Sequence, residues 1–161
     1  MRYLKQLGCV NYVFPTAVHN RFEHCIGTAH IAKELMLKLK SKQPSLEIDE
    51  KDVNNVSIAG LCHDLGHGPF SHVFDNHFLR YINPNTQWTH EWASTRLLEH
   101  LVDRSQSDLD EKDPIDLTKD DVRLICDLIE GETRGRSERL WMFDIINNKR
   151  NSIDVDKFDY I

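Results

Sequence analysis

The segment 62–75, C-H-D-L-G-H-G-P-F-S-H-V-F-D, holds the densest group of side chains that can ligate a metal ion or carry a proton. His63 and Asp64 are adjacent in it and follow the apolar run 58–61, which is typical of a helix that ends at the edge of a core. An imidazole and a carboxylate can ligate one ion, and the C-terminal end of a helix favours a cation. Because a carboxylate in this position is costly to desolvate alone, Asp64 requires a metal ion or a cationic partner.

A second polar segment, H-N-R-F-E-H at residues 19–24, lies upstream. Arg21 and His24 are three positions apart, so they share one face if the segment is helical. An imidazole that holds an ion beside a guanidinium that holds a phosphate oxygen suits a phosphate-processing site.

The third segment is I-D-V-D-K-F-D-Y at residues 153–160. On a helix, Asp156 and Tyr160 share a face, and Lys157 lies next to them. The segment thus offers a further carboxylate ligand, an ammonium group for phosphate and a phenol.

Each of these patterns also has an ordinary structural interpretation. The pair His63 and Asp64 could lie on the surface, and Arg21 and Glu23 could be common surface charges. The acidic residues of 153–160 could begin a solvated helix, since acids favour the first turn. Histidines on a polar helix face would account for His67, His72 and His77. The occurrence of all of these patterns in one chain favours a single joint site.

The elements that must position these residues are predicted to be helices. Apolar residues recur at three- and four-residue steps from about Val18 to Leu39, which predicts a first helix. Asp49 is a plausible N-cap of a second helix that ends near Gly66. A short third helix is expected from Pro69 through 78.

The second half of the chain follows the same pattern. Thr89 is expected to open a fourth helix, and the charged segment 103–117 is expected to be a surface loop. A fifth helix is predicted from Thr118 to Gly131, a sixth over about 137–147 and a seventh from near residue 153. Residues 10–14 could pair as a short strand, and no other strand pattern is evident, so the predicted fold class is all-α.

The composition is that of a globular protein with one domain. The 161 residues include 40% hydrophobic and 29% charged residues, and the net charge of −6 disfavours nucleic acid as a partner of the whole surface. The basic pair Lys149 and Arg150 is too small a patch to reverse this. No apolar run reaches the ~20 residues of a membrane span. The four cysteines lack CxxC spacing, and polar residues interrupt the N-terminus, so we expect reduced thiols and no signal peptide.

In order and spacing, His24, the pair His63 and Asp64, and Asp156 resemble the ligands of the HD superfamily of metal-dependent phosphohydrolases. The similarity is greatest to HD domains of eukaryotic SAM-and-HD-domain proteins that hydrolyse deoxynucleoside triphosphates (dNTPs). It rests on R-Y-L-K-Q-L-G (2–8), Y-V-F-P (12–15), H-N-R-F-E-H (19–24), A-G-L-C-H-D-L-G-H-G-P-F-S-H (59–72), W-T-H-E (88–91) and N-K-R-N-S-I-D-V-D-K-F-D-Y (148–160). The least distinctive region is 103–140.

The resemblance implies a helical bundle with a metal site at its centre. It further implies hydrolysis of dNTPs, including dGTP, to deoxynucleoside and inorganic triphosphate, in the nucleus or cytoplasm. The implied cofactor is a divalent metal (Fe, Mn, Zn or Mg), with ligands His24, His63, Asp64 and Asp156. Two imidazoles and two carboxylates leave positions open on an octahedral ion, which suits Fe, Mn or Mg better than a closed structural zinc site.

The resemblance also implies roles for other residues. The implied catalytic residues are His67, His72, Asp75 and His90. The implied substrate-binding residues are Arg21, Lys157, Tyr160, Gln6 and Leu7, and Arg2 falls on a contact to an allosteric GTP or dGTP.

Members of this family have a SAM domain before this region and a long helical part after it, and they form homo-oligomers. We therefore expect residues 1–161 to be an HD domain that is incomplete at both ends, and to bind metal while hydrolysing little dNTP alone. Two other functions remain. One is a different HD phosphohydrolase, a 5′-nucleotidase or phosphodiesterase, which the motifs at 2–8 and 148–160 disfavour. The other is a non-catalytic module that binds nucleotides or, against its acidic charge, nucleic acid.

Overall fold

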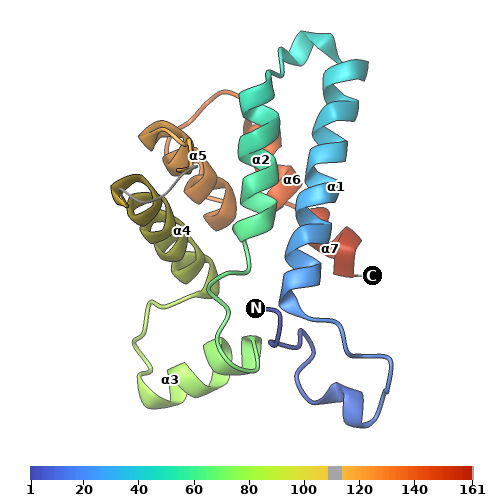
Figure 1. Ribbon diagram of the computed structural model, residues 1–161, viewed down its shortest axis with the longest axis vertical. Helices are drawn as coiled ribbons and strands as arrows, with labels where there is room; N and C mark the ends of the chain where they lie inside the picture. Colours follow the sequence, from blue (N-terminus) through green and yellow to red (C-terminus); the bar gives the residue numbers. More distant parts are fainter. Residues whose placement is uncertain (109–113, 161) are drawn as a thin grey trace.

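The computed structural model describes residues 1–108 and 114–160 (Figure 1). Within these ranges every regular element is helical, and the β pairing is one isolated bridge between Lys5 and Asn20, so the all-α prediction is confirmed. The α-helices are α1 (Arg21–Lys42), α2 (Glu50–Cys62), α3 (Leu79–Ile82), α4 (His90–Ser107), α5 (Lys119–Glu130), α6 (Phe143–Ile146) and α7 (Val155–Tyr160). Three short 3₁₀ turns (Val10–Tyr12, Pro44–Leu46 and Leu140–Met142) and a π-helical turn (Phe74–Phe78) complete the set.

The long helices begin where side chains can cap them. The Asn20 side chain accepts a hydrogen bond from the Glu23 amide, and the Glu23 carboxylate accepts one from the Asn20 amide, both at 3.0 Å. This reciprocal cap starts α1 at Arg21, three residues later than predicted, and leaves Arg21 and His24 in its first turn. Asp49 caps α2 as predicted.

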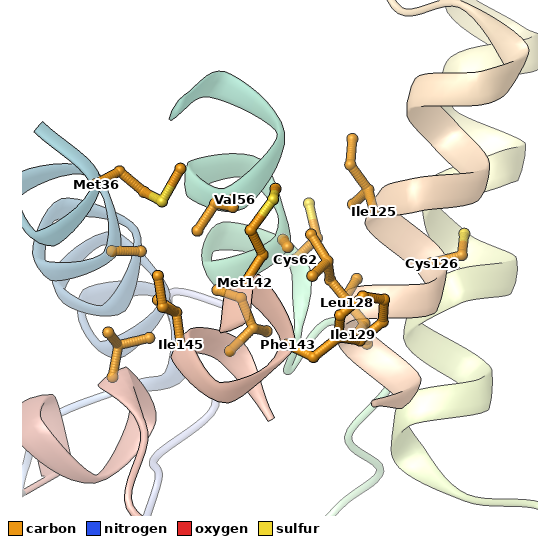
Figure 2. Close-up of a cluster of buried hydrophobic side chains, with 14 of the residues drawn as sticks. Met36, Val56, Cys62, Ile125, Cys126, Leu128, Ile129, Met142, Phe143 and Ile145 are labelled. Carbon is orange, nitrogen blue, oxygen red and sulfur yellow. The ribbon is translucent and has the colours of Figure 1, made fainter. Parts of the chain in front are cut away.

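The core lies between α1, α2, α5 and α6. α2 occupies the centre of the molecule, with α1 on one side and α4 and α5 on the other (Figure 1). Figure 2 shows the buried side chains that meet there, among them Met36, Val56, Ile125, Leu128 and Met142. The helices α1 and α2 approach closely at Gly60. A Cβ at this position would lie only 3.2 Å from the Thr28 carbonyl oxygen. The C-terminal end of α2 therefore reaches the edge of the core, where residues 63–64 follow it.

The predicted helix over 69–78 is wrong in its first three residues. Phe70 and Ser71 adopt left-handed backbone conformations, with φ of 62° and 52°, and a run of such residues cannot continue a right-handed helix. The chain is helical again from His72 onward, through the π-helical turn and α3. This irregular stretch, which follows Pro69, is what turns the chain over the end of α2.

Three other boundaries also differ from prediction. The possible strand at 10–14 is a 3₁₀ turn, since Gly8 reverses the chain with φ of 57° and Pro15 has no N–H to donate. The sixth helix begins only after Arg139, whose backbone is left-handed. The predicted loop at 103–117 starts later, because α4 continues to Ser107. Residues 109–113 of that loop lie outside the described ranges.

Within the described ranges, none of the helices is both long and apolar enough to cross a membrane. Separately, helices α1, α2, α4, α5 and α7 form a chain of packed pairs, and the polar segments identified in the sequence lie at helix ends.

The N-terminus of α5 contains a buried ionic cluster around Asp121, whose side chain is 7% exposed. One carboxylate oxygen is 2.9 Å from Asn55 Nδ2 and 3.0 Å from Lys51 Nζ, and the other accepts from the Thr118 amide at 3.0 Å. Burial alone would raise the pKa of Asp121, but the hydrogen bonds from Thr118, Asn55 and Lys51 outweigh it and hold the pKa well below its usual range.

Asp121→Asn should lower the free energy of unfolding by about 1–3 kcal/mol at pH 7, because charged hydrogen bonds are replaced by weaker ones. A lowered folded-state pKa contributes stability above the unfolded value of about 3.9 that is lost as the pH falls below it. The difference in free energy of unfolding between the unmutated protein and Asp121→Asn should therefore shrink below about pH 4. Urea unfolding at several pH values measures it. The exposed neighbour Asp120, changed to Asn, is the control and should cost under about 0.5 kcal/mol. An equal effect of both substitutions would contradict the assignment.

Candidate metal centre and substrate pocket

A cavity of about 400 Å³ opens where the first turn of α1, the chain after α2, the start of α4 and α7 meet. All five residues that the resemblance assigns to substrate line it: Gln6, Leu7, Arg21, Lys157 and Tyr160. Three of the four predicted metal ligands and three of the four predicted catalytic residues also line it: His63, Asp64, Asp156, His67, His72 and His90. Asp75 is buried behind His90, and His24 is buried behind Asp64 and Asp156.

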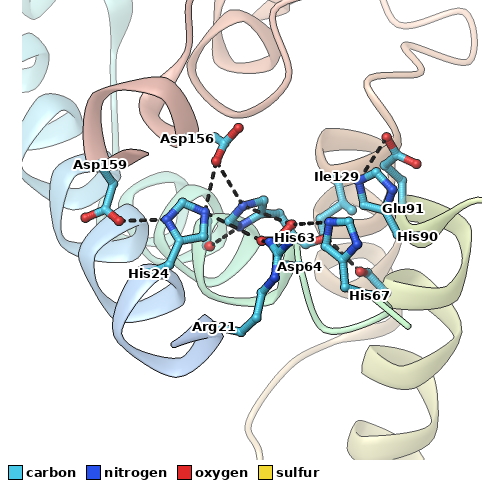
Figure 3. A network of polar contacts seen from close by, with 12 residues as sticks. Arg21, His24, His63, Asp64, His67, His90, Glu91, Ile129, Asp156 and Asp159 are labelled. Carbon is cyan, nitrogen blue, oxygen red and sulfur yellow. Dashed lines mark hydrogen bonds and ion pairs between the residues drawn. The ribbon is translucent and has the colours of Figure 1, made fainter. Parts of the chain in front are cut away.

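Three of the predicted ligands, His24, His63 and Asp64, offer ligand atoms that lie within 4.8 Å of one another, and Asp156 lies beside both histidines (Figure 3). His24 Nε2 lies 2.9 Å from Asp156 Oδ1 and 3.5 Å from Asp64 Oδ2. His63 Nε2 lies 3.4 Å from Asp64 Oδ1 and 3.7 Å from Asp156 Oδ1. Neighbouring ligand atoms of an ion bound at about 2.1 Å are roughly 3 Å apart, so these separations suit one ion with little rearrangement.

The protonation of the two histidines also fits a metal ion. His63 Nδ1 is 2.7 Å from the Gly60 carbonyl oxygen, which can only accept, so this nitrogen carries the proton. Nε2 of His63 and Nε2 of His24 are buried and have no hydrogen-bond partner. Each faces carboxylate oxygens, and two such acceptors repel unless a proton or a cation lies between them. The donor set therefore fits a divalent ion.

The electrostatics of the site attract cations. Burial would raise the pKa of Asp64 and of Asp156, but contacts with the surrounding histidines, and with Arg21 for Asp64, hold both pKa values well below the usual range. Burial would lower the pKa of His24 and of His63, but the neighbouring carboxylates raise both pKa values instead. The carboxylates are thus ionised throughout the neutral range and offer a cation two anionic ligands.

The thiols beside the ligands remain protonated. Burial raises the pKa of Cys25 to about 12 and that of Cys62 to about 11. Although each is adjacent in sequence to a ligand histidine, neither belongs to the group of ligand atoms around His24, His63 and Asp64.

Arg21 links the metal centre to the loop after α2. Its guanidinium is buried and donates one hydrogen bond to Asp64 Oδ2 and another to Ser71 Oγ at 2.6 Å. Ser71 is one of the two left-handed residues of the irregular stretch, so that backbone conformation brings a hydroxyl to Arg21. The guanidinium is thereby fixed beside the cavity, where a phosphate oxygen could reach it.

Three histidines form a group on the other side of Asp64. The rings of His67 and His90 stack with centroids 4.0 Å apart, and His72 lies edge-on to both. His90 Nδ1 is 2.8 Å from Asp75 Oδ2, and His67 Nε2 is 3.3 Å from Asp64 Oδ1. Burial, aided by His90 and Arg21, lowers the pKa of His67. This histidine is therefore neutral near pH 7 and can accept a proton.

Gly66 allows the loop that carries His67 to pack closely against the start of α4, which carries His90. A Cβ on residue 66 would lie 2.4 Å from the His90 carbonyl oxygen and from the Ser94 amide nitrogen, so only glycine permits the approach of the loop to α4. The Gly66 amide donates to Ser94 Oγ at 2.8 Å, and Ser94 Oγ donates to the His63 carbonyl at 2.6 Å. The loop that carries His67 is thereby attached to the helix that carries His90.

Some residues at the site were not predicted from the sequence. Asp159 contacts His24 Nδ1 at 2.7 Å, Ser71 binds Arg21, and Glu91 Oε1 lies 3.3 Å from His90 Nε2. For Asp159 a sequence signal existed, because it lies three positions after Asp156 and shares its helix face. Arg2 is placed elsewhere: its guanidinium lies over the ring of Phe22 at 4.5 Å and does not line the cavity.

Comparison with known proteins agrees with this geometry. Residues 21–161 match the HD domain family. The deoxynucleoside triphosphate triphosphohydrolase SAMHD1 of Bos taurus is 44% identical over 173 residues, which cover 99% of this chain and 29% of that protein. The SAMHD1 homolog of Dictyostelium discoideum is 45% identical over 161 residues, which cover 100% of this chain and 30% of that protein.

A more distant relative is the putative HD domain-containing protein L394 of Acanthamoeba polyphaga mimivirus, which is 35% identical over 174 residues and of which the match covers 35%. The chain therefore spans about a third or less of the length of these curated relatives. Since the family match includes all four predicted metal ligands and most of the chain, this protein belongs to the HD domain family.

Proposed function

We propose that this chain is the metal-dependent catalytic HD domain of a dNTP triphosphohydrolase, which converts dNTPs such as dGTP to deoxynucleoside and inorganic triphosphate. The observation that carries the proposal is the shared position of Asp64. One of its oxygens faces His24 and Arg21, and the other faces His63 and His67. Metal ligands, a phosphate-binding cation and a proton carrier are thus in contact with one carboxylate.

The residues divide the work according to their chemistry. A bound divalent ion, of which Fe, Mn or Mg suits the ligand set best, would neutralise phosphate charge and lower the pKa of a water molecule. Arg21 and Lys157 line the cavity and can hold phosphate oxygens, while Tyr160 and the pair Gln6 and Leu7 can contact the sugar. Zn remains a further candidate for the ion.

The histidine group can handle the proton of the leaving 5′ oxygen. His72 and His90 line the cavity beside His67. Asp75, which contacts His90 Nδ1, orients that ring and favours its proton on Nδ1. A group of this kind typically contributes a factor of about 10²–10⁴ to the rate.

The resemblance supports three further proposals about the whole protein. Arg2, outside the cavity, would contact an allosteric guanine nucleotide. The protein would act as a homo-oligomer in the nucleus or cytoplasm. Nucleic acid is a weaker candidate partner, because the net charge of −6 disfavours its binding.

Product analysis tests the proposed function. The protein is loaded with Mn²⁺ and incubated with dGTP for long enough to detect the slow hydrolysis expected of residues 1–161 alone. Nucleosides and phosphates are then separated by ion-exchange chromatography. Deoxyguanosine and inorganic triphosphate in equal amounts, absent from an Asp64→Ala control, are expected. Orthophosphate released from a deoxynucleoside monophosphate, or hydrolysis of a cyclic nucleotide, would instead identify another HD phosphohydrolase. Saturable binding of dGTP without any hydrolysis would identify a non-catalytic binding module.

A further inference from the structure

The two ring nitrogens of His24 face different carboxylates (Figure 3). Nε2 points to Asp156 and Asp64, whereas Nδ1 lies 2.7 Å from Asp159 Oδ2 on α7. Because the ionised carboxylate of Asp159 can only accept, its contact stabilises the proton on Nδ1. The lone pair of Nε2 is then directed to the point where the other ligands converge.

The structure also contains the space that this contact requires. Gly27 lies three residues after His24, on the same face of α1. A Cβ at this position would be 1.8 Å from Asp159 Oδ1 and 2.6 Å from its Cγ. Any larger residue at 27 would therefore displace the carboxylate from α1. One oxygen of Asp159 contacts His24, and the other lies over the bare backbone of Gly27.

We propose that Asp159 is a positioning residue for the metal centre: it fixes the tautomer and ring orientation of His24, and Gly27 provides the space for it. The inference rests on the metal site of the proposed function. Histidines that ligate metals commonly donate their other N–H to a carboxylate, and removal of that partner costs about 10–100-fold in metal affinity. On α7, Asp156 and Asp159 thus serve the same ion in two ways, one as ligand and the other through His24.

The main test measures Mn²⁺ binding by competition with a chelator. Asp159→Ala should raise the Mn²⁺ dissociation constant by about 10–100-fold. Asp159→Asn, which keeps an acceptor oxygen, should have a smaller effect. The matched control is Asp144→Ala: this carboxylate is 24% exposed, against 22% for Asp159, and pairs with Arg150 outside the cavity. The control should bind Mn²⁺ as the unmutated protein does. A dissociation constant within twofold of the unmutated value in Asp159→Ala would overturn the inference.

A second measurement separates positioning from general structural support. In Zn²⁺-loaded protein labelled with ¹⁵N-histidine, the Nδ1 proton of His24 should give a downfield resonance that exchanges slowly with solvent. Asp159→Ala should lose it while circular dichroism stays unchanged. If that variant does not fold, the unmutated protein still decides the question, because absence of the resonance there contradicts the hydrogen bond. Gly27→Ala should reproduce the weaker Mn²⁺ binding by displacing the carboxylate.

These outcomes are distinct from those of the proposed function. Protein that binds Mn²⁺ tightly through His24 and Asp159, but releases no triphosphate, would refute the activity and leave the positioning role intact. Equal Mn²⁺ affinity with and without the Asp159 carboxylate would refute the positioning role whatever the activity. An unmutated protein that binds no Mn²⁺ would refute both.

Discussion

Replacing Asp64 with alanine is expected to abolish metal binding and to reduce dNTP hydrolysis by at least about 10³-fold. Loss of a residue that only orients a ligand costs about 10–100-fold in metal affinity, and loss of a ligand itself costs more. The substitution also leaves the buried Arg21 without its carboxylate partner, and breaking a buried ion pair on one side costs about 3–5 kcal/mol. The measurements are elemental analysis, triphosphate release and thermal unfolding of the purified protein.

The isosteric variant Asp64→Asn distinguishes these two effects. It retains an oxygen that can accept from Arg21, so the loss of stability should be smaller, whereas the ion loses an anionic ligand in both variants. Asp144→Ala, outside the cavity, should retain both metal and activity. A full equivalent of metal in Asp64→Ala would show that the ion binds elsewhere.

Replacing His67 with alanine is expected to leave the metal in place and to cut turnover by about 10²–10⁴-fold, the usual effect of losing an acid–base group. The ring of His67 stacks on His90 and contacts Asp64, and its lowered pKa keeps it neutral at pH 7. It is therefore next to the ion but separate from the four predicted ligands. Elemental analysis and steady-state kinetics at saturating Mn²⁺ check both parts.

His77→Ala is the control for this substitution. His77 is exposed and lies in the π-helical turn that follows the loop of His67, so its removal should change neither metal content nor turnover. If His67→Ala turns over within threefold of the unmutated protein, the histidine group does not carry the proton. Metal loss in His67→Ala would place this residue among the ligands.

The sequence predicted the long helices well, for a local reason. Periodic apolar residues and capping side chains such as Asp49 and Thr118 act within a few positions of the chain, and the structure has helices at both. The ligand motif was recognisable because His63 and Asp64 are adjacent and follow an apolar helix. The approach of these two residues to His24 and Asp156 is a property of the fold, and the resemblance to HD phosphohydrolases, rather than any local pattern, implied it.

The features that sequence did not predict depend on distant contacts. Asp159 contacts a histidine 135 positions away. Its spacing from Asp156 indicates a shared helix face, but it does not indicate which residue that face meets. The backbone of Phe70 and Ser71 is left-handed, although neither residue type favours that conformation. This backbone conformation accompanies a hydrogen bond from the guanidinium of Arg21, 50 positions earlier in the chain, to Ser71 Oγ. Pro69 by itself favoured the first turn of a helix, so tertiary structure overrode the local preference here.

The position of α7 has a consequence for the biosynthesis of the protein. Asp156 leaves the ribosome about 90 residues after Asp64, which is roughly 5–18 s at synthesis rates of about 5–20 residues per second. During this interval the growing chain holds three ligands and lacks the fourth, as well as the carboxylate that orients His24. A six-residue helix such as α7 is not stable alone and forms only by docking on α1. Full affinity for the ion is therefore expected only after α7 has been synthesised and has docked on α1.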